Sequence, residues 1–352
     1  MAGQTRVSVV VPFYGKDVFL KGCIENILQQ TLRDLEVVVV SEPDAAPELT
    51  AFLDEHPDPR IRHLPNPTRL GLERSLNRVM PECHGEYLAR QDSDDLSAPR
   101  RLERQVAYLD SHKDIDILGT WSHMVSADLT LIGPNRPPVG PGFVRWFSLF
   151  EDPIINSSSM MRRGVFQKAG GYDPEMSSAE DYAFWTEALK TCTMDNLPEV
   201  LCYQRRNPAG VSLTNPGRQT ELAHLISRRS MEEVLGHELT EGVAWAMRRP
   251  YLMAGLEDCI EGERQLLRLR DSFLEGRPAS PDDVRKIRDD LHSRIWRLSM
   301  RGFGISPWRG TSAVARALLR SPPRLRPKDL KQWASLSSVS FREGRRTKGG
   351  AP

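Results

Sequence analysis

Residues 7–40 read VSVVVPFYGKDVFLKGCIENILQQTLRDLEVVVV, and this stretch decides the fold. It begins and ends with short, continuous runs of β-branched residues, which are typical of strands covered on both faces in a parallel sheet. Between the two runs, apolar residues recur at helical spacing: Val18, Leu20, Ile24, Ile27 and Leu28. Parallel strands need a crossover connection, usually a helix, so residues 7–40 predict a β-α-β unit.

The same alternation continues along the chain. Strands are predicted at 61–64 and 87–89, with a helix between them whose apolar face is Leu72, Leu76, Val79 and Met80. Pro99 is expected to open a further helix at its first position, before a strand at 115–118. A strand-like run at 158–161 and a helix beginning near Glu180 follow. The sequence therefore predicts an α/β fold: a doubly wound, mostly parallel sheet with flanking helices.

The chain of 352 residues is longer than one core usually supports, so two units are expected. Residues 1–215 are predicted to form the α/β domain, and 216–321 a mainly helical C-terminal region. Residues 322–352 are rich in Pro, Ser and Arg and are expected to be a loosely ordered basic tail.

Charge is distributed unevenly, because residues 301–352 hold 12 Lys and Arg against two acidic residues, although the whole chain has a net charge of +1. A basic end suits an anionic partner such as a membrane surface, a lipid phosphate or nucleic acid, and equally a solvated chain end. No apolar run approaches the roughly 18 residues that cross a bilayer, and a secretory h-region is lacking. We expect a cytoplasmic protein and leave open a peripheral contact with the inner face of the membrane through the basic C-terminus.

Three loops follow strands of the predicted sheet. In an open parallel sheet, ligands bind beyond the carboxyl ends of the strands, so these loops should converge. The first, Pro12-Phe13-Tyr14-Gly15, offers an aromatic face for a base but has neither GxGxxG nor GxxxxGK[ST], which argues against dinucleotide and P-loop sites. The second, Ser41-Glu42-Pro43-Asp44, offers carboxylates for a ribose or base edge, and the third is Gln91-Asp92-Ser93-Asp94-Asp95.

Three carboxylates within four residues repel one another unless a cation or hydrogen-bond donors neutralise them. Mg²⁺ or Mn²⁺, held by one or two of these carboxylates and by phosphate oxygens, would stabilise a leaving nucleoside diphosphate. The alternative is a solvated acidic turn that caps the next helix.

Several pieces, in order, resemble the family 2 glycosyltransferases, which have a GT-A type fold, over about residues 6–210. The similar pieces are 7–14, 35–40, 66–77, 85–95, 99–102, 170–173 and 179–185. The resemblance implies that donor base, ribose and diphosphate are bound by Pro12, Tyr14, Glu42, Arg69, Asp92 and Glu180. It further implies that Asp94 binds the metal and that Asp181 is the catalytic base; an isolated Asp181 would be interpreted as a first-turn helix acid.

The chain departs from the family pattern in three places. Ser41-Glu42-Pro43 stands where the second strand usually ends in paired aspartates. Histidine is missing near 156–158 and near 205–207, so a third metal ligand is not identified. Arg205 and Arg206 are the alternative groups for holding the diphosphate directly.

The expected function is that of an inverting, Mn²⁺- or Mg²⁺-dependent transferase moving a sugar from a nucleotide diphosphate sugar to a hydroxyl acceptor. The acceptor would be a glycan, lipid-linked glycan or protein glycan in surface polysaccharide or glycoconjugate biosynthesis, and not nucleic acid; a homo-oligomer is left open. One alternative is a nucleotidyltransferase, which would normally carry a Gly-rich loop after the first strand. The other is a catalytically silent, nucleotide-binding scaffold.

Overall fold

The computed structural model describes residues 5–14, 18–207, 216–253, 255–276 and 279–306. The chain divides into two compact units, the first ending at Ile226 and the second beginning at Ser227. The predicted boundary near 215 directly precedes helix α9, Pro216–Leu235, and the two units divide within that helix. The predicted basic tail, 322–352, lies outside the described residues.

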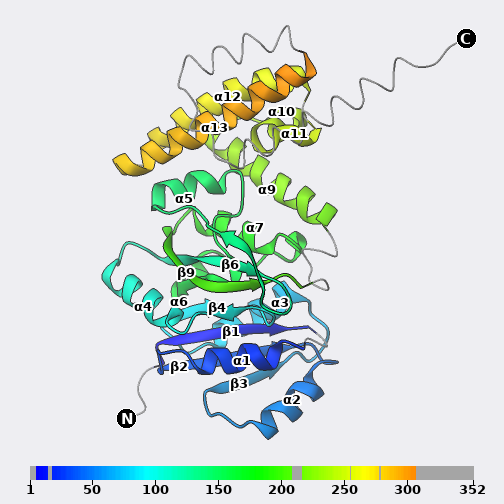
Figure 1. Ribbon diagram of the computed structural model, residues 1–352, viewed down its shortest axis with the longest axis vertical. Coiled ribbons are helices and arrows are strands. Elements are labelled where there is room, and N and C mark those ends of the chain that lie inside the picture. The colour runs from blue at the N-terminus through cyan, green and yellow to red at the C-terminus, as the bar shows by residue number, and fades with distance from the viewer. Residues whose placement is uncertain (1–4, 15–17, 208–215, 254, 277–278, 307–352) are drawn as a thin grey trace, which may run out of the picture. The chain divides into compact units, whose positions relative to one another are not determined.

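The first half of the sheet is parallel, as the sequence predicts. Its strand order is β3-β2-β1-β4, with β1 between β2 and β4 (Figure 1). Val7 of β1 pairs with Leu35 of β2 on one side and with Tyr87 of β4 on the other. The elements are β1 Val7–Phe13, α1 Leu20–Leu28, β2 Leu35–Ser41, α2 Ala46–Glu55, β3 Ile61–Pro65, α3 Leu72–Val79, η1 Met80–Glu82 and β4 Tyr87–Arg90.

The second half of the sheet is mixed. Strand β8 pairs antiparallel with both β4 and β6, β6 pairs parallel with β9, and β5 and β7 pair antiparallel with β9 and β6. The strands are β5 Leu96–Ser97, β6 Ile117–Val125, β7 Leu131–Asn135, β8 Met160–Arg162 and β9 Met194–Arg205. The strand expected at 115–118 is therefore the beginning of a longer one, and the run at 158–161 is the 3-10 turn η2, Asn156–Ser158, followed by β8.

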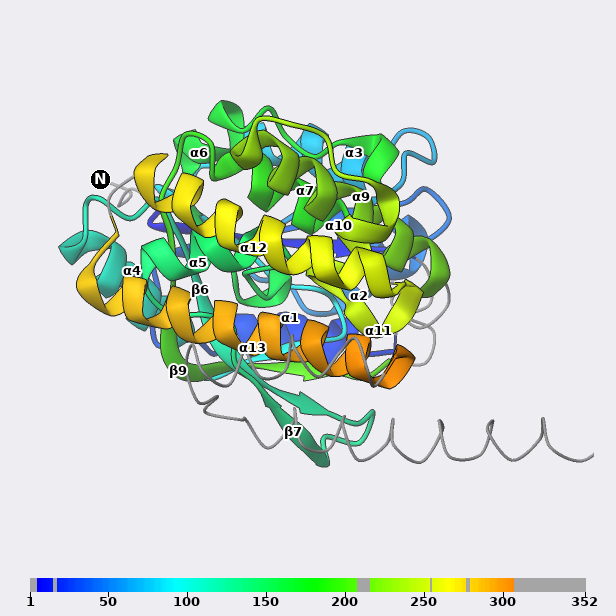
Figure 2. The same cartoon turned by 90° about the horizontal axis from the view of Figure 1, so that it is seen from above.

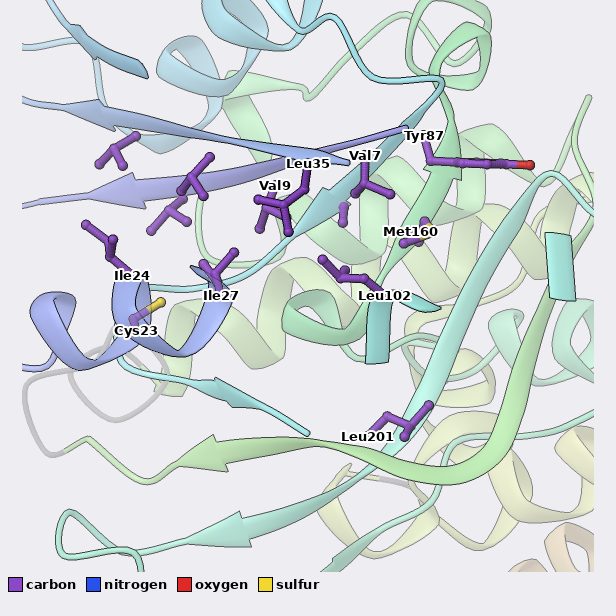
Figure 3. Packing of buried hydrophobic residues seen from close by; sticks show 14 of the residues in the cluster. Val7, Val9, Cys23, Ile24, Ile27, Leu35, Tyr87, Leu102, Met160 and Leu201 are labelled. Carbon is purple, nitrogen blue, oxygen red and sulfur yellow. The ribbon is translucent and has the colours of Figure 1, made fainter. Parts of the chain in front are cut away.

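Alternate residues of each strand point to opposite faces of the sheet, and each face has its own apolar core. Val9 and Val11 lie in one core with α1 and α4, whereas Val10 lies in the other with α3, α6 and α7. Figure 3 shows Cys23, Ile24 and Ile27 of α1 directed toward the strands. The sheet is thus covered by helices on both sides: α4 Arg101–Ser111, α5 Pro141–Ser148, α6 Arg163–Lys168, η3 Pro174–Met176 and α7 Glu180–Ala188.

The sequence predicts that Pro99 is the first residue of a helix, and this prediction is wrong. Helix α4 begins at Arg101, and Pro99 lies in the turn before it. That turn is closed by a hydrogen bond from the backbone N–H of Arg101 to the carbonyl of Ala98, at 3.0 Å. Proline here shapes the approach to the helix instead of forming its first residue.

The second unit is helical where it is described, as predicted. It contains α10 Glu241–Arg248, α11 Pro250–Met253, α12 Leu256–Gly276 and α13 Pro281–Ile305. Helices α12 and α13 lie side by side (Figure 2), and Leu266, Leu269, Ile287 and Leu291 are fully buried. Thr240 and Ser280 cap α10 and α13 by accepting hydrogen bonds from backbone N–H groups three residues on. No described helix has the length and apolarity to cross a bilayer.

Candidate active site

The carboxyl ends of β1, β2 and β4 lie along one edge of the sheet, as the sequence predicts. Pro12 is opposite Val40 of β2, and Val10 is opposite Arg90 of β4. The pairing extends one residue further, because the N–H of Gln91 donates to the carbonyl of Val10 at 3.2 Å. The loops that follow these three strands are therefore neighbours.

Three hydrogen bonds hold the Asp92–Asp95 turn after β4. The N–H of Asp95 donates to the carbonyl of Asp92 at 3.1 Å, and the N–H of Asp92 donates to Ser157 Oγ at 3.1 Å. The carboxylate of Asp95 is buried and accepts the backbone N–H of Arg205 at 2.7 Å. Burial, together with the charges of Asp92 and Asp94, raises the pKa of Asp95 well above its usual range. Asp95 is thus a structural acid, while Asp92 and Asp94 remain partly exposed.

Two residues at the end of β9 contact Asp94. Asn207 donates from Nδ2 to Asp94 Oδ2 at 3.0 Å, and Arg205 donates from Nε to the Asp94 carbonyl at 2.8 Å. The guanidinium of Arg205 also lies 4.1 Å from the ring centroid of Phe19 and donates to the carbonyl of Ala127. These contacts hold Arg205 beside the turn, and the alternative role of Arg205 and Arg206 as direct diphosphate ligands stays a prediction.

No group of three His, Cys, Asp or Glu side chains within the described ranges could hold a metal ion unaided. A divalent cation at the Asp92–Asp95 turn would therefore depend on ligands from outside the protein. Mg²⁺ commonly binds in this way, through one or two carboxylates together with substrate phosphates and water.

Arg90, the last residue of β4, is a buried cation beside the turn. It is 3% exposed, and its Nε donates to Asp92 Oδ1 at 3.1 Å. The side-chain oxygen of Asn156 accepts from Arg90 Nη1 at 2.9 Å, and the guanidinium lies over the ring of Tyr172. Burial alone would lower the pKa of Arg90, but the charges of Asp92, Tyr172 and Glu180 raise it. Arg90 is therefore always charged and compensates the surrounding carboxylates.

The amino end of α7 adds two further carboxyl groups, Glu180 and Asp181. Glu180 is buried, and burial together with the charge of Asp181 raises its pKa to about 8. Burial also raises the pKa of Asp181, against the opposing effects of the Tyr182 N–H and of Arg90. Asp181 Oδ1 accepts that N–H at 2.7 Å. The electrostatic interactions with Arg90 and Asp92 place Asp181 near the turn after β4, as the predicted base requires.

The carboxylate of Glu42, after β2, is occupied by the protein. Glu42 is 2% exposed and accepts the backbone N–H of Gly71 at 2.8 Å and that of Leu70 at 3.1 Å. Gly71 has φ +80°, a conformation that favours glycine, so the loop can present both N–H groups to one side chain. Glu42 therefore secures the 70–71 loop, and its role in base recognition stays a prediction.

The remaining predicted donor-binding residues differ in exposure. Pro12 is buried in β1, whereas Tyr14 is 42% exposed just beyond that strand. Partial burial raises the pKa of the Tyr14 phenol, and the interaction with Ser75 opposes that shift. The Arg69 side chain is 74% exposed and pairs with Asp44 at 2.7 Å. Tyr14 is thus placed to offer a ring face at the sheet edge, and Arg69 an exposed charge nearby.

Sequence reasoning missed four residues that shape this site: Arg90, Asp152, Ser157 and Asn207. Arg90 could have been found, because it directly precedes the acidic motif. Ser157 and Asn207 lie in the segments where the family often has a histidine, so the departure from the family pattern marks these positions. Asp152 carried none, because no motif surrounds it and only the packing around α7 brings it to Asp181.

Known proteins give an independent comparison. The family model described as "Glycosyl transferase family 2" matches residues 8–169. An uncharacterized glycosyltransferase of Haemophilus influenzae is 30% identical over 237 residues, covering 64% of this chain and 73% of that protein. The O-antigen biosynthesis glycosyltransferase WbnJ of Escherichia coli is 27% identical over 203 residues, covering 56% of this chain and 79% of WbnJ.

Among solved structures, S. aureus TarS residues 1–349, in complex with UDP-GlcNAc, is similar with a TM-score of 0.55 at 17% identity. The match covers 96% of this chain and 92% of that one, and it concerns the fold. The family model and the relative from Haemophilus influenzae together define a glycosyltransferase. The chain belongs to glycosyltransferase family 2.

Proposed function

We propose that this protein is an inverting, metal-dependent glycosyltransferase that moves a sugar from a nucleotide diphosphate sugar to a hydroxyl acceptor. The observation that carries the proposal is that Asp92 and Asp181 both interact with the buried guanidinium of Arg90, one after β4 and the other at the start of α7. These two segments would supply a place for a diphosphate and a proton acceptor.

A divalent cation fits the residues that are present. Asp94 is partly exposed, and a carboxylate can accept at both of its oxygens, so the hydrogen bond from Asn207 Nδ2 to Asp94 Oδ2 does not exclude a cation. Asp94 would hold Mn²⁺ or Mg²⁺ together with diphosphate oxygens and water. When bound, the cation would neutralise the negative charge that develops on the departing nucleoside diphosphate.

The protein's own residues supply positioning and proton transfer. Tyr14 offers its ring to the base, and Asp92 together with Glu180 offers acceptors to sugar hydroxyls. The Asp181 carboxylate accepts the proton of the acceptor hydroxyl while that oxygen forms a bond to the anomeric carbon. The bond from this carbon to the diphosphate oxygen breaks, and the nucleoside diphosphate leaves with the bonding electron pair. Attack from the face opposite the leaving group inverts the anomeric centre.

The biological setting proposed is the assembly of a surface polysaccharide or another glycoconjugate. The similarity to WbnJ, described as an O-antigen biosynthesis glycosyltransferase, supports this setting. The bound UDP-GlcNAc in TarS supports a nucleotide sugar as the donor class.

The test is a calorimetric titration of the protein with UDP, GDP, CDP and dTDP, with and without Mn²⁺. We expect one nucleotide to bind in the presence of Mn²⁺, and Asp94→Ala to abolish that binding. Asp116→Asn is the matched control, because Asp116 also accepts a backbone N–H, from Thr193, but lies at the opposite end of the sheet. If no nucleotide binds under any condition, the silent scaffold replaces the transferase.

A further inference from the structure

We propose that Asp152 and Asp181 act as one carboxyl pair that shares a single proton, with Asp152 as the positioning residue that orients the base. The inference rests on the proposed function, in which Asp181 is that base. Nothing in the sequence around Asp152 marks it, and its role follows from what it touches.

The backbone on both sides fixes the geometry of the pair. Asp152 lies in the segment that follows α5, and Asp181 is the second residue of α7. Their side chains are hydrogen-bonded to each other. Asp152 Oδ1 also accepts the N–H of Ile154 at 3.2 Å, just as Asp181 Oδ1 accepts the N–H of Tyr182.

A second contact ties the two segments together. The hydroxyl of Tyr182, the residue after Asp181, donates to the carbonyl of Ser148 at 2.6 Å. Ser148 is the last residue of α5, four positions before Asp152. The two carboxyl groups are therefore presented to each other by elements that are themselves joined.

Two carboxyl groups can hydrogen-bond directly only if one of them carries a proton, because two ionised carboxylates have acceptors alone. Like charges held this close cannot both ionise, which is the principle of the paired aspartates of aspartic proteases. Burial, and next the charge of Asp181, raises the pKa of Asp152 well above its usual range. We place the shared proton on Asp152, which donates it in a hydrogen bond to the Asp181 carboxylate.

The surrounding charges favour retention of that proton. Asp181 faces Arg90 of β4 and Asp92 of the following turn, and Glu180 and Tyr172 also interact with the pair. The single guanidinium of Arg90 is opposed by several acids, so a second negative charge on the pair is unfavourable. During turnover Asp181 takes the acceptor proton, the pair then holds two protons, and one is released to solvent.

The first test is the pH profile of kcat/KM for donor turnover, measured in a Glu180→Gln background because Glu180, with a pKa of about 8, would add a basic limb of its own. In that background we expect an acid limb from Asp181 and a basic limb where Asp152 loses its proton. Asp152→Asn supplies an amide donor that does not titrate, so it should keep activity within about tenfold and lose the basic limb. Asp152→Ala has no donor and should lose about 10- to 100-fold. Asp116→Asn should leave the profile unchanged.

The second test needs no activity. The infrared carbonyl band of a protonated carboxylic acid should be present at neutral pH in the native protein and in Asp116→Asn. Asp152→Asn should weaken this band by the contribution of one carboxyl group, because Asp95 and Glu180, whose pKa values are also raised, keep their own protons. Asp152→Ala removes the same carboxyl group and makes the same comparison if Asp152→Asn does not fold.

The outcomes separate the two proposals. If Asp181→Asn retains full donor turnover, the proposed base is wrong. If Asp181→Asn abolishes turnover but Asp152→Asn keeps the basic limb, or neither change at Asp152 weakens the carboxylic acid band, Asp152 holds no shared proton. A weaker band together with loss of the basic limb supports the pair.

Discussion

The turn after β2 and the turn after β4 occupy comparable places at one edge of the sheet, yet their carboxylates have different uses. Glu42 is buried, and backbone N–H groups of the 70–71 loop bind both of its oxygens. Asp92 and Asp94 are partly exposed and face Arg90 and Asn207. Sequence position predicts where a carboxylate lies, and the donors around it decide whether it serves the fold or a ligand.

The largest effect on stability is expected from Arg90→Met. This change removes the buried cation that pairs with Asp92, whose side chain is 34% exposed. Loss of one partner of a fully buried ion pair costs about 3–5 kcal/mol, so we expect a loss of about 3 kcal/mol here. Arg69→Met is the matched control, because its pair with Asp44 is mostly exposed and should contribute about 0–1 kcal/mol. Denaturant unfolding of both variants measures the difference, and equal losses would contradict the compensating role of Arg90.

Glu42→Gln should cause a smaller loss of stability than Arg90→Met. The amide keeps the shape of the side chain but loses the charge and directs an NH₂ group toward backbone donors. Because hydrogen bonds to charged groups contribute about 1.5–3 kcal/mol, we expect a decrease of that size in the free energy of unfolding. Asp94→Asn should stay within about 0.5 kcal/mol, since Asp94 is partly exposed. A larger loss of stability for Asp94→Asn than for Glu42→Gln would show that the two turns have been assigned the wrong roles.

The next prediction concerns pH and Glu180, whose pKa is raised from its ordinary 4.5 to about 8, first by burial and then by Asp181. The folded protein keeps a proton that the unfolded chain releases above pH 4.5. The contribution of Glu180 to stability is therefore full below pH 4.5 and is lost as the pH rises through 8. Thermal unfolding across this range should show a steeper decline in the native protein than in Glu180→Gln. Parallel curves would mean that Glu180 titrates normally.

Sequence reasoning located the fold because its strongest signals are local. The runs at 7–11 and 35–40 form β1 and β2, and the spacing between them forms α1. The mixed half of the sheet was not predicted, since the β6–β9 pairing joins residues that are distant in sequence and depends on tertiary packing. The sequence predicts one strand over 158–161, where the structure has the 3-10 turn η2 followed by the short strand β8. This boundary also depends on tertiary packing.

The sequence indicates which segments form the candidate site, but it does not indicate the hydrogen bonds that their side chains make. Asp92, Asp94 and Asp181 were placed from their motifs, and the structure brings their segments together. The occupation of Glu42 by the 70–71 loop depends on the positive φ of Gly71, which one sequence does not reveal. The Tyr182–Ser148 hydrogen bond, which joins the segments of Asp152 and Asp181, likewise has no sequence signature.

The most direct test of the central claim is the rate of nucleoside diphosphate release from the matching nucleotide sugar by the native protein and by Asp181→Asn. The account predicts that Asp181→Asn binds the nucleotide with native affinity but releases product about 10²- to 10⁴-fold more slowly, the usual contribution of a general base. Release at the native rate with native binding would contradict the assignment of Asp181 as the base.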